Sequence, residues 1–173
     1  MKSNKLIMGI VSVALAVLGG VFAFFNIFDF TLGKDAVAVE DFFGFFSEGE
    51  SLKAQKILYA LSDKEYAPAF KTIAGVLAII VLVVAVAYLL LLLLDKKGTN
   101  FASLRKILSI AQAVLGILIA ICLVVYVASN TVTDTIAISC SFMPALCLTL
   151  CPVLAGVLGF ATDSDSKKSK KKK

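Results

Sequence analysis

The stretch AIIVLVVAVAYLLLLLLD, residues 78–95, decides the fold class of this chain. It is apolar except for Tyr88 and the closing Asp95, and its apolar residues follow one another without a period of two. Such a run indicates a helix in lipid rather than a strand, because lipid cannot satisfy the backbone of an open strand. Crossing roughly 30 Å of hydrocarbon takes about 20 helical residues, so we predict a membrane span over residues 72–94.

Three further runs are long enough to cross a membrane: 6–25, 107–128 and 136–161. Asp, Glu, Lys, Arg and His are absent from all four ranges of the sequence. The 173 residues are 60% hydrophobic, with a mean hydropathy of +0.95, which a soluble domain with a polar shell does not sustain. We predict an all-α, polytopic membrane protein whose four-transmembrane-helix bundle occupies residues 1–161 as a single domain.

Residues 1–23 also fit a second interpretation, a cleaved signal peptide. Lys2 and Lys5 precede the first apolar run, and Ala23 offers a small residue at a cleavage position. The run is long for a signal peptide, and Phe24 and Phe25 follow it where a polar mature sequence is expected. Cleavage would leave three helices.

The charges are sorted by connection. Twelve basic residues lie at three alternate ends of the spans, whereas the connection 26–70 holds eight acidic residues and four lysines, and 129–135 holds one Asp and no base. By the positive-inside rule both termini face the cytoplasm and these two connections face outward. The net charge of +5 therefore reflects topology and predicts no nucleic-acid binding. We expect an integral, multi-pass protein of the plasma membrane.

The first outer connection contains EDFFGFFSEGE, residues 40–50, in which four phenylalanines lie among four carboxylates. On a helical wheel its apolar residues form one stripe, and a second stripe follows after Gly49. We predict a short amphipathic helical segment that rests in the membrane interface, caps the bundle or binds another protein. The predicted interaction surface is Val39, Phe42, Phe43, Phe46, Ile57, Leu58 and Leu61.

Small residues recur at every fourth position in three spans. The rows are Ser12-Ala16-Gly20, Ser109-Ala113, Gly116-Ala120 and Ala155-Gly159. Such rows allow close approach of helix backbones in lipid and predict a compact bundle. Pro144 and Pro152 both fall within the predicted fourth span and predict a bend there.

Sulfur atoms form one stripe in the fourth span, at Cys140, Met143, Cys147 and Cys151. Soft ligands of this kind suit Cu(I). The stripe extends roughly 16 Å at 1.5 Å per residue, too far for one ion, so only Cys147 and Cys151, with Cys122 from the third span, remain as weak metal candidates. Buried cysteine commonly packs as a small hydrophobe, and we predict no cofactor.

Catalytic signals are absent from the sequence. There is no histidine, and the chain contains no GxGxxG, Walker A, HExxH or GxSxG pattern. Gln112 is the one carboxamide well inside a span, and we interpret it as a hydrogen-bonding group between helices rather than a pore-lining group. Tyr88 and Tyr126 are interpreted as amphipathic residues at opposite interfaces.

The sequence ends in DSDSKKSKKKK, residues 163–173, and we predict a disordered, lysine-rich cytoplasmic tail over 162–173. Its lysines are expected to fix topology and to attract anionic lipid headgroups. They are Lys167, Lys168, Lys170, Lys171, Lys172 and Lys173.

These features predict a non-enzymatic membrane protein, an accessory subunit or interaction module that uses its first outer connection. Its partners would be the bilayer and a membrane protein or further copies of itself. The alternative is a small oligomeric transporter or channel component.

Overall fold

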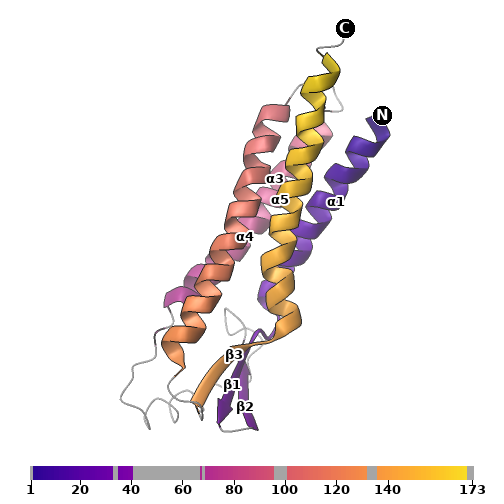
Figure 1. Cartoon of the computed structure of the whole chain (residues 1–173). Helices are drawn as coiled ribbons and strands as arrows, with labels where there is room; N and C mark the ends of the chain where they lie inside the picture. The colour runs from indigo at the N-terminus through magenta and orange to yellow at the C-terminus, as the bar shows by residue number, and fades with distance from the viewer. Residues whose placement is uncertain are drawn as a thin grey trace.

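The computed structural model describes residues 2–32, 35–40, 67, 69–95, 101–131 and 136–170. Four long helices and three short strands make up this part of the chain (Figure 1). The elements in chain order are α1 (Lys2–Val21), the 3-10 helix η1 (Phe22–Phe24), β1 (Phe28–Leu32), β2 (Asp35–Glu40), α3 (Ala69–Asp95), α4 (Ala102–Asn130), β3 (Ile136–Cys140) and α5 (Phe142–Lys170).

Each of the four long helices contains a segment long and apolar enough to cross a membrane. These segments are Asn4–Phe24, Ala69–Asp95, Ala102–Asn130 and Phe142–Asp163. The predicted all-α four-helix bundle of a multi-pass membrane protein is thereby confirmed. Large apolar side chains stay exposed along every one of these helices, as suits surfaces that face acyl chains.

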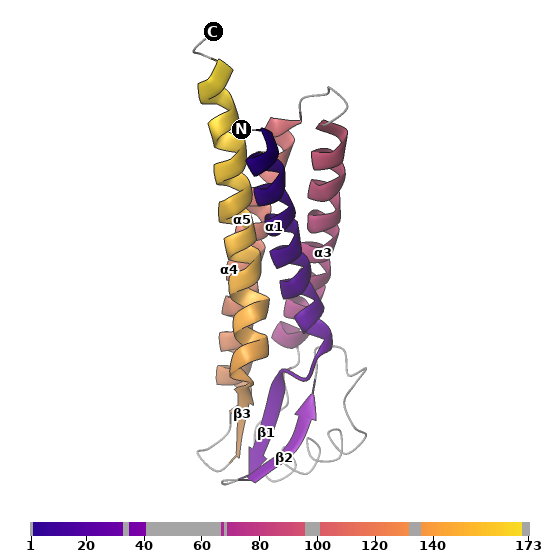
Figure 2. The same ribbon diagram turned by 90° about the vertical axis from the view of Figure 1, so that its right-hand side faces the viewer.

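Successive helices run in opposite directions, so both termini lie at one end of the bundle and the strands at the other (Figure 1). We call these ends the termini end and the sheet end. α1 and α4 each pack against both α3 and α5, which closes the four helices into a ring (Figure 2).

The small residues lie where the helices approach most closely, as predicted. A Cβ added at Gly156 of α5 would collide with the carbonyl oxygen of Ser109 on α4, and one added at Gly116 would lie 2.8 Å from the carbonyl oxygen of Thr149. On the α1 side, the Ser12 hydroxyl donates to the carbonyl oxygen of Ala155 at 2.7 Å. Backbone contact of this kind maximises dispersion contacts where lipid offers no hydrophobic drive.

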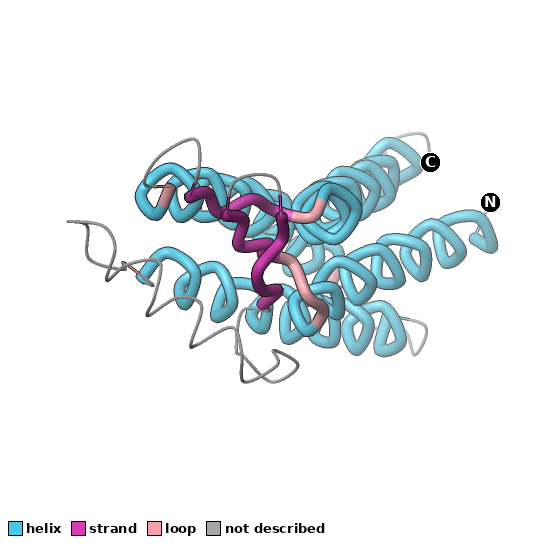
Figure 3. The backbone as a smooth tube through the Cα atoms, turned by 90° about the horizontal axis from the view of Figure 1, so that it is seen from below, coloured by secondary structure: helices cyan, strands magenta, loops and turns pink. Residues whose placement is uncertain are grey.

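A three-stranded antiparallel sheet of order β2-β1-β3 covers the sheet end. Seen from that end in Figure 3, the strands cross the helix ends. β1 follows α1 and η1, and β3 directly precedes α5, so their pairing joins the first helix to the last. Phe28 lies opposite Cys140, and the buried Phe28 and Phe30 of β1 extend the apolar core of the bundle into the sheet.

Two predictions about these strands are wrong. An amphipathic helix is predicted for Val39, yet this residue lies in β2 opposite Asp29. The sequence DAVAVE alternates β-branched and small residues, and it pairs with β1 on both sides of a register shift between Phe30 and Thr31. Residues 136–140 were assigned to the fourth span but form β3. There Ile138 is buried and Ser139 is exposed, the alternation of a strand.

Helix α5 therefore begins at Phe142, where the amide of Ala145 bonds the carbonyl of Ser141. This start puts Pro144 in the first turn, a position where proline costs no intrahelical hydrogen bond, so the bend predicted for it is not required. Pro152 lies inside the helix, and its ring packs on Gly19 of α1, where an added Cβ would be 2.7 Å from the proline Cδ.

The helix then continues to Lys170, where a disordered tail was predicted from residue 162. Two contacts lie at the beginning of this extension: the Thr162 hydroxyl donates to the carbonyl of Leu158 at 2.7 Å, and Arg105 donates to Asp163.

Candidate functional site

The most polar part of the bundle interior is a charge network at the termini end. Arg105 of α4 lies between Asp95 of α3 and Asp163 of α5. Its Nη1 donates to Asp95 Oδ2 at 2.6 Å, its Nη2 to Asp163 Oδ1 at 2.7 Å and its Nε to the same oxygen at 3.0 Å. The side chains of Arg105 and Asp163 are 6% and 2% exposed, and that of Asp95 is 28% exposed.

Tyr88 adds a fourth side chain to this network. Its hydroxyl donates to Asp163 Oδ2 at 3.3 Å, and the other oxygen of Asp95 accepts the backbone N–H of Phe101 at 3.2 Å. Tyr88 is fully buried, and so is Tyr126 at the sheet end. The two tyrosines lie toward opposite ends of the bundle, as predicted, but their side chains pack inside it, against Asp163 and Phe28, rather than on its lipid-facing surface.

The charge network acts as a clamp between three helices. One guanidinium against two carboxylates leaves one formal negative charge, and hydrogen bonds from Tyr88 and Phe101 compensate part of its desolvation. Removing one partner of a buried ion pair costs about 3–5 kcal/mol, because a charge is then left unpaired. Each of the three nitrogens of Arg105 donates within the protein, so the network ties α4 to both α3 and α5.

Gln112 lies two turns further along the same buried face of α4. It is fully buried, and within the described residues neither its Oε1 nor its Nε2 has a hydrogen-bond partner. The predicted hydrogen bond between helices is therefore not formed within the part of the chain that the structure describes. An unpaired buried amide is costly in a low-dielectric interior, so Gln112 is a candidate for binding a polar guest.

The sheet end is fixed to the bundle by hydrogen bonds and one aromatic contact. The backbone N–H of Ser141 donates to the carbonyl of Ile27 at 2.7 Å, and its hydroxyl donates to Asp29 Oδ2 at 2.8 Å. The rings of Phe28 and Tyr126 meet edge to face, with centroids 4.8 Å apart. β1, β3 and α4 are therefore joined into one packed unit.

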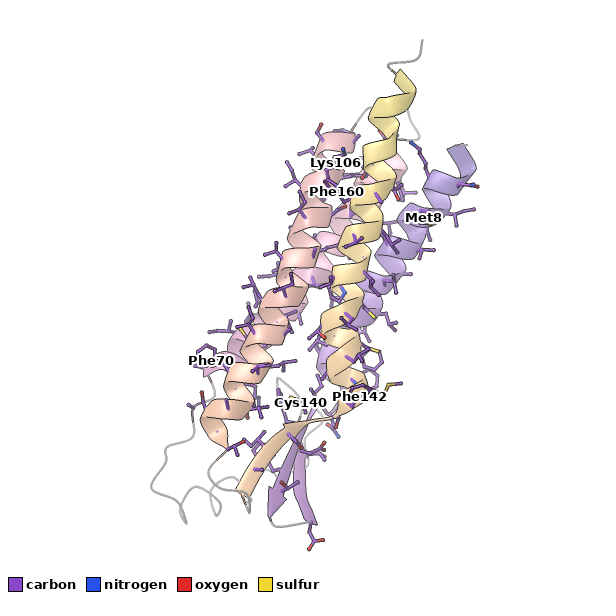
Figure 4. The ribbon with its side chains drawn as sticks, in the orientation of Figure 1. Met8, Phe70, Lys106, Cys140, Phe142 and Phe160 are labelled. Atoms are coloured by element: carbon purple, nitrogen blue, oxygen red, sulfur yellow. The ribbon has the colours of Figure 1, made fainter. Side chains whose placement is uncertain are left out.

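Cys140 lies within this unit, beside the start of α5 (Figure 4). Burial raises the pKa of its thiol to about 11, and the negative charge of Asp29 adds to the shift. The thiolate is the reactive form of cysteine, so this side chain is a poor nucleophile at neutral pH.

The remaining cysteines do not assemble a metal centre. Cys147 and Cys151 lie one turn apart on α5 and Cys122 is on α4, and all four cysteines are free thiols. In the ranges that the structure describes, no group of three His, Cys, Asp or Glu side chains could hold a metal ion.

Most of the predicted interaction surface lies outside the described residues. Phe42, Phe43, Phe46, Ile57, Leu58 and Leu61 fall there. Val39, which is described, is half-buried in β2. Of the tail lysines, Lys167, Lys168 and Lys170 lie in the last turns of α5, and residues 171–173 are outside the described part of the chain.

The charge network is not predicted from the sequence, in which Arg105 is one of the twelve basic residues outside the predicted spans and Asp163 falls in the predicted tail. A signal was present in the small-residue rows. Arg105 precedes Ser109 by four residues, and Asp163 follows Gly159 by four, so each continues a packing row by one turn. Extending the rows in this way would have brought both charges onto facing sides of α4 and α5.

Comparisons with protein-family models, with curated proteins and with solved structures give no match.

Proposed function

We propose that this protein is a non-enzymatic accessory or interaction subunit of a membrane assembly, and that it binds its partner through residues 41–66, which connect β2 to α3. The supporting observation is that both neighbours of this connection are fixed. Glu40 ends β2 within the sheet, and Ala67 is held by the Asn130 amide of α4. Asn130 accepts the N–H of Ala67 at 2.9 Å and donates to its carbonyl at 3.1 Å.

Anchoring at both ends favours binding by such a connection, because less conformational entropy is lost when the partner docks. The sequence of the connection supplies the contacts. Its phenylalanines offer large apolar area, and the first connection as a whole carries eight acidic residues against four lysines. The complementary partner surface is an apolar groove with basic residues at its rim.

Site-specific photocrosslinking tests this proposal. A photoreactive residue at Phe43 is expected to capture one discrete membrane protein in cells, whereas the same residue at Val83, which is exposed on the lipid side of α3, is expected to label lipid. Asn130→Leu removes the anchor of Ala67 and should reduce the Phe43 adduct several-fold at equal protein level. Adducts at Phe43 that contain only lipid or this chain's own helices would overturn the partner-binding role.

A small transporter or channel component is the second candidate, and the unpaired amide of Gln112 favours it. A polar solute crossing the bundle would need such a group near mid-membrane. A solute flux into liposomes that Gln112→Leu abolishes would support transport. If the protein does not transport a solute, Gln112→Leu only removes an unsatisfied amide and is expected to raise the free energy of unfolding by about 1–3 kcal/mol.

We further propose that both termini face the cytoplasm and that the lysines at the end of α5 meet anionic headgroups. Each lysine near such a surface contributes about 1 kcal/mol, less at high salt. Replacing Lys167, Lys168 and Lys170–Lys173 by glutamine is expected to lower the anionic lipid that co-purifies with the protein. Unchanged lipid composition would leave the lysines without this role.

A further inference from the structure

An apolar groove opens between α4 and α5 in the half of the bundle nearer the sheet end. Its volume is about 720 Å³, within the range of roughly 300–1,000 Å³ that holds small ligands in proteins. Three elements line it: α4, β3 and α5. Its lining includes Ala120, Val124 and Ala128 of α4, Cys140 of β3, and Ala145 and Leu150 of α5.

The groove is bounded at both ends of its length. On the side of the bundle middle, α4 and α5 come into backbone contact, since a Cβ at Gly116 would lie 2.8 Å from the carbonyl oxygen of Thr149. At the sheet end, β3 runs across it with Ile138, Ser139 and Cys140 in the lining. Between these limits the α4 lining from Ala120 to Ala128 is roughly 12 Å long, at 1.5 Å per residue.

The groove faces hydrocarbon along its side. Its α4 and α5 residues belong to the membrane-spanning segments, and the side chains of Val124 and Phe142 in its lining are 69% and 74% exposed. Figure 4 shows Phe142 at the start of α5, next to Cys140. The hydroxyl of Thr149 is turned back to the carbonyl of Ala145 at 2.9 Å, so the deep end of the groove is apolar.

We propose that this groove binds one acyl chain of a phospholipid from the leaflet on the sheet side, with the ester and headgroup beside the exposed Ser139. A length of roughly 12 Å is close to half of the roughly 30 Å hydrocarbon thickness, which is the reach of one leaflet. An acyl chain also matches the apolar lining and adapts to its shape. A membrane-spanning helix of a partner or a second copy needs a surface across the whole bilayer, and the Gly116–Thr149 contact ends the groove at mid-membrane.

Tryptophan fluorescence tests this proposal, because the chain contains no tryptophan. Phe142→Trp places a reporter at the groove, and Phe70→Trp places a matched one on the first turn of α3, where Phe70 is 37% exposed and lines no part of the groove. The probe is a phosphatidylcholine brominated near the ester end of one acyl chain, added in small amounts to the purified protein in detergent. Saturable quenching is expected for Phe142→Trp at stoichiometric lipid, and only weak, linear quenching for Phe70→Trp.

A groove-filling variant checks that the lipid lies inside. Ala145→Leu in the Phe142→Trp background is expected to raise the lipid concentration for half-quenching at least tenfold. Ala161→Leu is the control, since Ala161 is exposed on the same helix outside the groove. Circular dichroism of each variant shows whether the bundle is intact.

Three results would overturn the proposal. Equal quenching of the two reporters would make the groove an ordinary part of the lipid-facing surface. Saturable quenching that Ala145→Leu leaves unchanged would put the lipid elsewhere. Loss of quenching together with a dimer that forms through α4 and α5 would assign the groove to a second copy. Because the test uses pure protein and lipid, its outcome is independent of whether residues 41–66 bind a partner.

Discussion

Arg105 and Asp163 are 58 positions apart in the chain, yet Nη2 of the arginine lies 2.7 Å from Oδ1 of the aspartate. Asp95 binds the same guanidinium from α3. Three of the four helices are therefore tied together at the termini end by one buried cation. These ion pairs help to fix the position of α3, α4 and α5 along the bundle axis, because a shift of one helix past another would break them.

Arg105→Met is expected to destabilise the bundle by about 3–5 kcal/mol, because Asp163 is left buried without its counter-charge. Denaturation of the purified protein in detergent measures this loss. Lys106→Met is the control. The Nζ of Lys106 lies 5.4 Å from the ring centroid of Phe160, and losing this cation–π contact should lower the free energy of unfolding by less than about 1 kcal/mol.

The paired variant Arg105→Met with Asp163→Leu is expected to recover most of the lost stability, since the buried carboxylate is removed with the guanidinium. If Arg105→Met and Lys106→Met have equal effects, the ion pair contributes no more than a surface contact does.

Gly156→Ala and Gly9→Ala should have opposite effects. Alanine favours both helices by about 1 kcal/mol over glycine. At Gly156 the new Cβ would strike the Ser109 carbonyl, and backbone cannot retreat, so a net loss of about 1–3 kcal/mol is expected. At Gly9 the new Cβ meets only the side chain of Leu92, with Cδ2 at 2.9 Å and Cδ1 at 3.0 Å, and this side-chain end can move, so stability should be unchanged or higher. Thermal denaturation of the two variants measures the difference. If both variants are as stable as the parent protein, α4 and α5 lie further apart at Gly156 than the structure shows.

Alkylation of Cys140 should depend steeply on pH. With a pKa of about 11 the thiol stays protonated at pH 8, so reaction is expected to be roughly two orders of magnitude slower than for a thiol of ordinary pKa. The rate should rise about tenfold per pH unit and level off near pH 11. The measurement uses a variant whose other three cysteines are alanine.

Ser139→Cys in a chain without Cys140 supplies the matched exposed thiol, one residue away on β3. Asp29→Asn removes the negative charge beside Cys140 and is expected to shift the profile to lower pH. A profile for Cys140 that matches that of Ser139→Cys would show that the thiol is solvated.

Labelling of intact cells tests the orientation. In a cysteine-free background, a membrane-impermeant thiol reagent is expected to label Ser51→Cys and not Ser169→Cys, because lysine-rich ends stay in the cytoplasm. Permeabilised cells provide the control, in which both positions react. Labelling of Ser169→Cys alone in intact cells would invert the proposed topology.

The bundle could be predicted from sequence because each span carries its own signal. A run such as residues 72–94 is long and apolar enough to become a helix in lipid whatever its neighbours do. The packing rows were visible for the same reason, since Ala155 and Gly159 are related by local helical spacing. The predicted helix ends were less accurate. Arg105 and Asp163 lie beyond the predicted spans 107–128 and 136–161, and their burial in α4 and α5 depends on an ion pair between the two helices, which local sequence does not reveal.

The sheet could not be predicted because its pairing is not local. Asp29 and Ser141, which bond across it, are 112 positions apart. Residues 136–140 also continue directly into the apolar fourth helix, so composition gives no boundary between them. The unpaired amide of Gln112 likewise depends on which side chains surround it, which no spacing within α4 reveals.

The central position of β1 has a consequence for biogenesis. β1 is synthesised early, whereas β3 is synthesised only after α1, α3 and α4. At translation rates of about 5–20 residues per second, this delay is roughly 5–20 s. During that time the edge of β1 that pairs with β3 has no partner strand, so the sheet is completed only when the last part of the chain is made. A nascent chain that stops short of Ile136 leaves this edge of β1 unpaired.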